Sequence, residues 1–185
     1  MSAKIRLAPG LLIATPSVQG IPFERSVILM LEHDQEGALG LVMNCELDIP
    51  CALIAEQLAL PWPSSAQENM LLGGPVQRDS LWLLHEDRWA FPETLRIGGG
   101  LAVSRSKLAL STLGEAKSER VRFFLGYSGW GGEQIIDEIR EGSWLTAPLD
   151  PALLFDTAPA KLWDAALRAL GIESALLISE EGALQ

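Results

Sequence analysis

The sequence predicts one α/β (α+β) domain in which short apolar strands alternate with helices. The 185 residues, 48% hydrophobic and 21% charged, suit a single unit, spanning residues 1–185, that can bury a sizeable core. Apolar runs of strand length recur along the chain, and segments with helical spacing and cap residues lie between them. No internal repeat or low-complexity tract interrupts this order.

The N-terminal third predicts three strands and a short helix. Residues 11–14 form a short strand, and residues 26–33 are apolar at consecutive positions, as expected for a strand covered on both faces. The polar loop 34–37 ends in glycine and leads into the apolar run 38–44, so these two strands form a hairpin. Pro50 stands at the start of a helix that ends before the prolines further on.

The middle of the chain predicts a second hairpin and a capped helix. Residues 70–72 and 81–85 are strand-like, and glycines and a proline between them favour a turn. After three consecutive glycines, Ser104 is the expected cap of a helix over 105–113. This arrangement leaves room for a smaller lobe around residues 90–118.

The C-terminal third centres on a glycine-rich segment with two aromatic residues, 125–134. It follows a strand-like run over 120–127 and precedes an apolar helical face that ends near Gly142, so it is expected at a strand-to-helix turn. A last helix has Pro159 near its start, Asp156 or Thr157 as its cap, and Gly171 just past its end. Residues 176–178 add a final short strand.

Charge and composition exclude several classes of function. The net charge of −10 and the scattered basic residues disfavour nucleic-acid binding. Apolar runs are too short for a membrane span, and no signal peptide is evident, so a cytoplasmic protein without a membrane partner is expected. The cysteines, Cys45 and Cys51, form neither a disulfide framework nor a zinc pattern, so no metal or cofactor is predicted.

Catalytic patterns are weak. The two histidines, His33 and His85, both stand at strand ends, and no third residue of metal-ligand spacing accompanies them. Ser128 lies near a Gly-x-Ser-x-Gly pattern, but its second glycine comes one residue early. Glycines before a helix can bind phosphate, yet Glu133 would itself occupy that positive helix end. No catalytic residue is therefore assigned.

Polar and aromatic side chains gather where the predicted strands stop, which is a common location for binding sites. The hypothesis is that they form one face that binds a ligand or a protein partner, with the indole of Trp130 and the amide of Asn44 bordering a common hollow. Its residues are His33, Asn44, Gly73, Gly74, Pro75, Tyr127, Trp130 and Gln134. The structural alternative is that both aromatic rings pack over glycines of a neighbouring strand.

The order of several motifs over almost the whole chain resembles the YqgE/AlgH family of bacterial proteins. The motifs are residues 10–16, 26–33 and 37–44, Gly73-Gly74-Pro75-Val76, Leu84-His85 and Gly126-Tyr127-Ser128-Gly129-Trp130. The resemblance implies a central mixed sheet, rich in hairpins, with flanking helices and a smaller inserted lobe. It implies no established activity, although the family name carries a proposed link to transcriptional regulation.

The resulting prediction is a non-enzymatic binding module whose partner, a protein or a small molecule, is unidentified. Two alternatives stay open: a transcriptional regulator, and a hydrolase that uses His33 or His85. The oligomeric state and the distance between the two histidines are also open.

Overall fold

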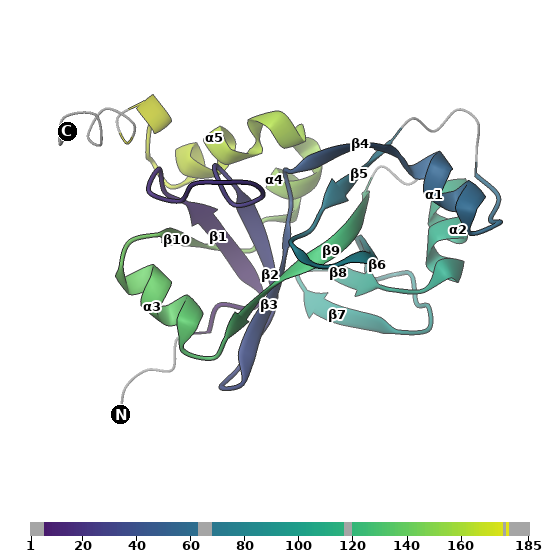
Figure 1. Ribbon diagram of the computed structural model, residues 1–185, viewed down its shortest axis with the longest axis horizontal. Helices are drawn as coiled ribbons and strands as arrows, with labels where there is room; N and C mark the ends of the chain where they lie inside the picture. The colour runs from purple at the N-terminus through teal and green to yellow at the C-terminus, as the bar shows by residue number, and fades with distance from the viewer. Residues whose placement is uncertain (1–5, 63–67, 117–119, 176, 178–185) are drawn as a thin grey trace.

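A computed structural model describes residues 6–62, 68–116, 120–175 and 177, and these residues contain ten strands and five helices. The strands form one curled sheet in which nearly all neighbours are antiparallel (Figure 1). One half, called sheet A here, has the order β10-β1-β2-β3-β9. Its strands are β1 (Gly10–Ala14), β2 (Val27–His33), β3 (Gly37–Val42), β9 (Val121–Gly131) and β10 (Trp144–Pro148).

The other half, called sheet B here, continues from β9 through β6 and β8 to β7. Two further strands join it on the opposite side of β9, where β5 pairs with β9 in parallel and β4 pairs with β5. These strands are β4 (Glu46–Pro50), β5 (Asn69–Leu72), β6 (Val76–Glu86), β7 (Thr94–Gly98) and β8 (Leu101–Ser104).

Strand β9 belongs to both sheets. Its first residues, Val121 to Leu125, pair with β6, whereas Ser128 to Gly131 pair with β3. Gly126 lies between these two stretches with a φ of 71°, a conformation that strongly favours glycine. The glycine therefore lets one continuous strand bend from sheet A into sheet B.

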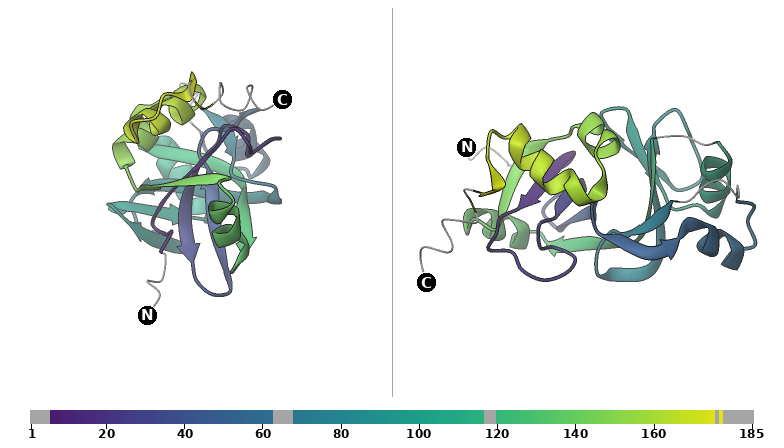
Figure 2. Two further views of the ribbon diagram at one scale, coloured as in Figure 1. Left: turned by 90° about the vertical axis from the view of Figure 1, so that its left-hand side faces the viewer. Right: turned by 90° about the horizontal axis from the view of Figure 1, so that it is seen from above.

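Helices cover the sheet in separate layers. Helices α4 and α5 lie together over one face of sheet A, whereas α1 and α2 lie at the far end of the molecule, on sheet B (Figures 1 and 2). Helix α3 packs on the other face of sheet A, beside Trp130 and Trp144. The helices are α1 (Cys51–Gln57), α2 (Lys107–Glu115), α3 (Gln134–Arg140), α4 (Pro151–Asp156) and α5 (Pro159–Ala169).

The core follows from the alternation of side chains along the strands. In β2, Val27 and Leu29 pack toward α4 and α5, whereas Ile28 and Met30 pack toward α3. All four side chains are fully buried, which explains the uninterrupted apolar run in the sequence. None of the helices in the described part of the chain has both the length and the apolar character that crossing a bilayer requires.

Several predicted elements are confirmed. Strands β1, β2 and β3 lie where the apolar runs place them, and β2 and β3 form the predicted hairpin. The fold as a whole is the expected α+β arrangement with flanking helices. Residues 90–118, the candidate for a smaller lobe, supply β7, β8 and α2, which belong to sheet B and its helical cover.

The second predicted hairpin is wrong. Strands β5 and β6 do not pair with each other, because β9 lies between them and pairs with both. The connection Gly73-Gly74-Pro75 crosses β9 instead of making a tight turn. The Gly73 N–H donates to the Leu125 carbonyl, and the Gly73 carbonyl accepts from the Val42 N–H.

Three helix boundaries also differ from the prediction. Ser104 is not a cap but the last residue of β8, and the hydroxyl of Ser106 caps α2 by accepting from the Leu108 N–H. Helix α2 continues through Gly114 to Glu115, and the Trp62 ring packs directly against this glycine. The side chains of Asp156 and Thr157 do not cap α5, which begins at Pro159 without a side-chain cap.

The glycine-rich segment 125–134 does span a strand-to-helix junction, but its strand portion is longer than predicted, since β9 continues to Gly131. The turn comes later, at Gly132 and Glu133, immediately before α3. The predicted final strand falls on residues 176–178, of which 176 and 178 lie outside the described residues.

Candidate functional site

The residues predicted to form one binding face lie at three different places on the sheet. His33 and Trp130 lie at the tip of the β2–β3 hairpin, which projects at the bottom of Figure 1, and Gln134, the first residue of α3, bonds to Gly131 beside them. The residues Gly73, Gly74, Pro75 and Tyr127 lie where the chain crosses β9. Asn44 follows the other end of β3.

At the hairpin tip, His33 and Trp130 flank the same residue of β3. His33 pairs with Ala38 on one side, and Trp130 pairs with Ala38 on the other. The backbone N–H of Leu7 donates to His33 Nδ1 at 3.4 Å. The ring of Trp130 is nearly buried and packs against Phe23.

A carboxylate that the sequence did not single out organises this end of the sheet. One oxygen of Glu138 accepts from the indole N–H groups of Trp130, at 3.1 Å, and Trp144, at 2.8 Å. The other oxygen accepts from the side-chain amide of Gln134 at 2.9 Å. The Gln134 carbonyl oxygen in turn accepts from the Gly131 N–H. The polar atoms of Trp130 and Gln134 therefore bond within the protein.

We expect Glu138→Ala to lower the free energy of unfolding by about 2 kcal/mol, because two half-buried indole N–H groups lose a charged acceptor. Urea denaturation followed by tryptophan fluorescence measures this change. Asp137→Ala is the matched control on the same helix. Asp137 forms only an exposed ion pair with Arg140, at 3.0 Å, so its loss should cost less than about 0.5 kcal/mol. Equal effects of the two substitutions would contradict the assigned role of Glu138.

The strand crossing is built from glycines in close backbone contact. A Cβ atom on Gly73 would overlap the Gly126 carbonyl, and one on Gly74 would overlap the backbone of Tyr127 and Ser128. The Ser128 hydroxyl is fully buried and donates to the Gly73 carbonyl at 3.0 Å. This serine therefore joins two chain segments and is not placed as a nucleophile.

The aromatic rings pack mainly against other aromatic side chains and not, as the structural alternative expects, over glycines of a neighbouring strand. The ring of Tyr127 packs against Trp82, with centroids 5.6 Å apart, and lies near Gly129 of its own strand. The ring of Trp130 packs against Phe23 and Trp144 and not over a glycine. Gly40 packs instead against Ile28 and Met30.

Asn44 joins the ends of β2 and β3. Its side-chain oxygen accepts from the Val27 N–H at 2.9 Å, and its amide nitrogen donates to the Arg25 carbonyl at 2.8 Å. Asn44 stands six positions beyond Ala38, the partner of Trp130, which is roughly 20 Å along a strand. The predicted common hollow between Trp130 and Asn44 is therefore not formed.

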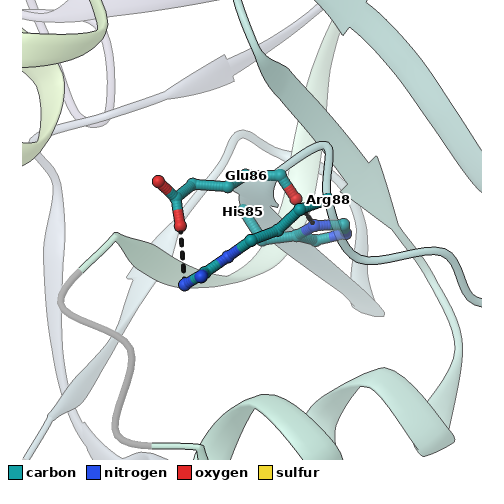
Figure 3. A network of polar contacts seen from close by, with 3 residues as sticks. All are labelled: His85, Glu86 and Arg88. Atoms are coloured by element: carbon teal, nitrogen blue, oxygen red, sulfur yellow. Dashed lines mark hydrogen bonds and ion pairs between the residues drawn. The ribbon is translucent and has the colours of Figure 1, made fainter.

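The two histidines lie far apart. His33 is at the hairpin tip near the C-terminal end of β9, whereas His85 pairs with Val121 at its other end. The His85 ring is fully buried, and Nδ1 donates to the Glu86 carbonyl at 2.8 Å (Figure 3). The Glu86 carboxylate itself turns away to form an ion pair with Arg88.

A chain of hydrogen bonds fixes the tautomer of His85. Because Nδ1 carries the proton, Nε2 accepts from the Ser104 hydroxyl at 2.8 Å. Ser104 then accepts from the Thr94 hydroxyl, which accepts from the Phe91 N–H. Burial lowers the pKa of His85 from its ordinary value, which favours the neutral imidazole. The serine and histidine are paired as in a nucleophilic site, but both side chains are fully buried.

Neither cysteine offers a reactive thiolate. Cys51 is buried and its sulfur lies 3.4 Å from that of Met70; burial raises its pKa to about 12. Burial also raises the pKa of Cys45. Among the described residues, no three His, Cys, Asp or Glu side chains lie close enough together to hold a metal ion.

A hollow of about 300 Å³ lies beside the hairpin tip. Its lining includes the acidic residues Glu32, Asp34 and Glu36, together with Gly37 and Trp130. One Asp34 oxygen accepts from the backbone N–H groups of Glu36 and Gly37 and so shapes the loop. Of the predicted site residues, Trp130 lines this hollow, and His33 and Gln134 adjoin it through the contacts described above.

Comparison with known proteins supports the fold and the motifs together. Residues 11–175 match the model of the AlgH-like family. The chain is 39% identical to a UPF0301 protein of Vibrio cholerae, with 92% of this chain and 95% of that protein covered. A UPF0301 protein of Ralstonia pickettii is 37% identical, with 97% and 96% covered.

Two solved structures are similar to this one. The solution structure of the AlgH protein from Pseudomonas aeruginosa has a TM-score of 0.79 and 36% identity, with 96% of both chains covered. A crystal structure of a Corynebacterium diphtheriae protein has a TM-score of 0.71, with 91% of this chain and 90% of that chain covered. Its identity is 21%, so it supports the fold alone.

Proposed function

This chain belongs to the AlgH-like family, and we propose that it is a non-enzymatic binding module that holds a cationic segment of a protein partner at the β2–β3 hairpin tip. The observation that carries the proposal is the acidic hollow beside that tip. Three acidic residues, Glu32, Asp34 and Glu36, line this hollow, and Trp130 also belongs to its lining.

The charge of the hollow favours a positively charged partner. Carboxylates attract lysine and arginine side chains and repel phosphate, so the lining suits a basic protein segment and not a nucleic acid. The net charge of −10 acts in the same direction over a longer range. The carboxylates are not grouped tightly enough to hold a metal ion, which favours a partner with several separated charges.

The surroundings of the hollow give it a rigid base. Trp130 is fixed by its neighbours Phe23 and Trp144 and by Glu138. A preorganised surface loses little conformational entropy on binding, so a modest number of charge pairs suffices for a measurable affinity. In this proposal Trp130 lines the binding hollow, and His33 and Gln134 lie next to it.

A titration with a short oligolysine peptide tests the proposal. We expect saturable shifts of the backbone amide signals of Glu36, Gly37 and Ala38, and no shift with an oligoglutamate peptide. The double variant Glu32→Gln with Glu36→Gln should weaken oligolysine binding roughly three- to tenfold, because each exposed charge pair contributes a few tenths of a kcal/mol to about 1 kcal/mol. Asp34 is left unchanged because it shapes the loop.

The control removes the same amount of charge elsewhere. Glu56→Gln with Glu115→Gln changes two exposed carboxylates on α1 and α2, and oligolysine should bind this variant as it binds the unchanged protein. If both double variants weaken binding equally, only the net charge matters and the proposed site is refuted. The same holds if the shifts spread evenly over the protein.

The alternative functions make different predictions. A hydrolase that uses His85 would have to expose an imidazole that is fully buried and bonded through both nitrogens. A hydrolase that uses His33 would lose turnover in a His33→Ala variant. A transcriptional regulator would bind DNA with an affinity that falls as salt rises.

A further inference from the structure

A second hollow, of about 200 Å³, lies on a different part of the molecule, where β5 and β9 separate beside the start of α5. The two strands pair at Leu71 with Phe124 and at Leu72 with Leu125. Two residues earlier along these strands, Asn69 and Arg122 line the hollow. Pro159 of α5 also belongs to the lining. The hollow therefore lies at the junction of sheet B with the helical layer of sheet A.

Arg122 is held in place from within the protein. Its Nη2 donates to the Phe155 carbonyl near the end of α4 at 2.7 Å, and Nη1 donates to the Val121 carbonyl at 3.0 Å. The guanidinium also lies over the Phe155 ring, 5.2 Å from its centroid. Part of its role is therefore structural, since a cation near the C-terminal end of a helix is favourable.

The lining of this hollow has both signs of charge. Glu46 and Glu68 line the hollow together with Arg122, and the side-chain amide of Asn69 donates to a Glu46 oxygen at 3.1 Å. The attraction of Glu68 and Asp156 partly offsets the effect of burial, which lowers the pKa of Arg122. Leu71, on the same face of the sheet as Arg122, adds apolar surface to the lining.

This combination selects one class of ligand by charge. A ligand with only a carboxylate would lie near two carboxylates of the protein, and a ligand with only an ammonium group would lie near the guanidinium. A molecule with both groups satisfies both sides. The volume corresponds to about seven water molecules at roughly 30 Å³ each, which is the size of a small amino acid.

We infer that this hollow binds a small zwitterionic α-amino acid with an apolar side chain. The ligand carboxylate lies toward Arg122 and Asn69, and the ligand ammonium group lies toward Glu46 and Glu68. Its side chain contacts Leu71. This site is separate from the hairpin tip, so the two proposals stand or fall independently.

Three related probes test this inference: L-valine, L-valinamide, which lacks the carboxylate, and N-acetyl-L-valine, which lacks the ammonium group. We expect L-valine to shift the amide signals of Asn69, Leu71 and Arg122 saturably, with a Kd on the order of 1 mM. Each of the other two probes should bind at least roughly tenfold more weakly, because each loses one charged partner.

Variants separate binding from folding. Glu46→Gln changes an exposed side chain and should weaken L-valine binding several-fold while the melting temperature stays unchanged. Arg122→Lys keeps a positive charge beside α4 but loses the planar guanidinium, and it should also weaken binding. Arg96→Lys, on exposed β7, is the control and should bind L-valine normally.

Three results would overturn the inference. One is the absence of any saturable shift with L-valine at tens of millimolar. Another is binding of L-valinamide as tight as that of L-valine, which would indicate a simple cation site. The third is equal binding of N-acetyl-L-valine, which would show that the ammonium group is not recognised.

Discussion

Replacing Gly74 with alanine will lower the free energy of unfolding by at least about 3 kcal/mol, because the strand crossing has no space for a methyl group. The added Cβ would overlap the backbone of Tyr127 and Ser128. These atoms belong to β9, which is paired with β3 and β6, so the overlap cannot be relieved by rotating a side chain. The melting temperature should fall by roughly 6–12 °C, at about 2–4 °C per kcal/mol for a chain of this length.

Gly129→Ala is the matched control for this prediction. Gly129 lies in the same strand, and the nearest atom to an added Cβ is Cε2 of Tyr127, at an ordinary contact distance of 3.7 Å. The stability should therefore change by less than about 0.5 kcal/mol. If thermal denaturation followed by circular dichroism gives the two variants the same midpoint, the close crossing at Gly74 does not exist as described.

Acidification will destabilise the protein through His85. The ordinary pKa of a histidine is 6.5, and burial lowers the pKa of His85 in the folded state. Below pH 6.5 the unfolded chain binds a proton at this imidazole that the folded protein does not yet accept. Stability therefore falls as the pH drops from 6.5 toward the lowered pKa, by up to about 1.4 kcal/mol per pH unit. Above that window both states are neutral and the effect vanishes.

Urea denaturation at pH values on either side of 6.5 measures this effect, and two variants assign it. His85→Gln removes the titrating group, so this part of the acid sensitivity should disappear, while the stability at neutral pH falls by roughly 1–3 kcal/mol through imperfect hydrogen bonding. His33→Gln changes the half-buried histidine at the hairpin tip and should keep the sensitivity due to His85. An unchanged pH dependence in His85→Gln would assign the effect to other groups.

The sequence predicted β1, β2 and β3 of sheet A well because their signal is local, whereas β10 was not predicted. Apolar residues at consecutive positions in 26–33 and the polar loop at 34–37 are sufficient to indicate β2, β3 and their hairpin. Pairings between distant segments have no such signal. Gly73 contacts Gly126, which lies more than fifty positions further along the chain. Local patterns alone therefore indicate a turn at Gly73 and an earlier end for the strand that continues to Gly131.

For the candidate sites, too, local signals were readable in the sequence and contacts between distant segments were not. Trp130 could be selected from its glycine-rich surroundings, but Glu138 looks like any polar residue on a helix surface until Trp144 arrives from a later strand. Arg122 is likewise positioned by its hydrogen bond to the Phe155 carbonyl. Phe155 belongs to α4, a helix that the sequence did not predict. For both side chains, the deciding contact is made by an element further along the chain.

The shared strand β9 has a consequence for the molecule as a whole. Its 11 residues form the last strand of sheet A and a central strand of sheet B, with Arg122 near one end and Trp130 near the other. Neither half keeps a complete set of backbone partners once the other is removed. We therefore expect that neither half of the chain folds on its own. Heating should unfold both halves in a single cooperative transition.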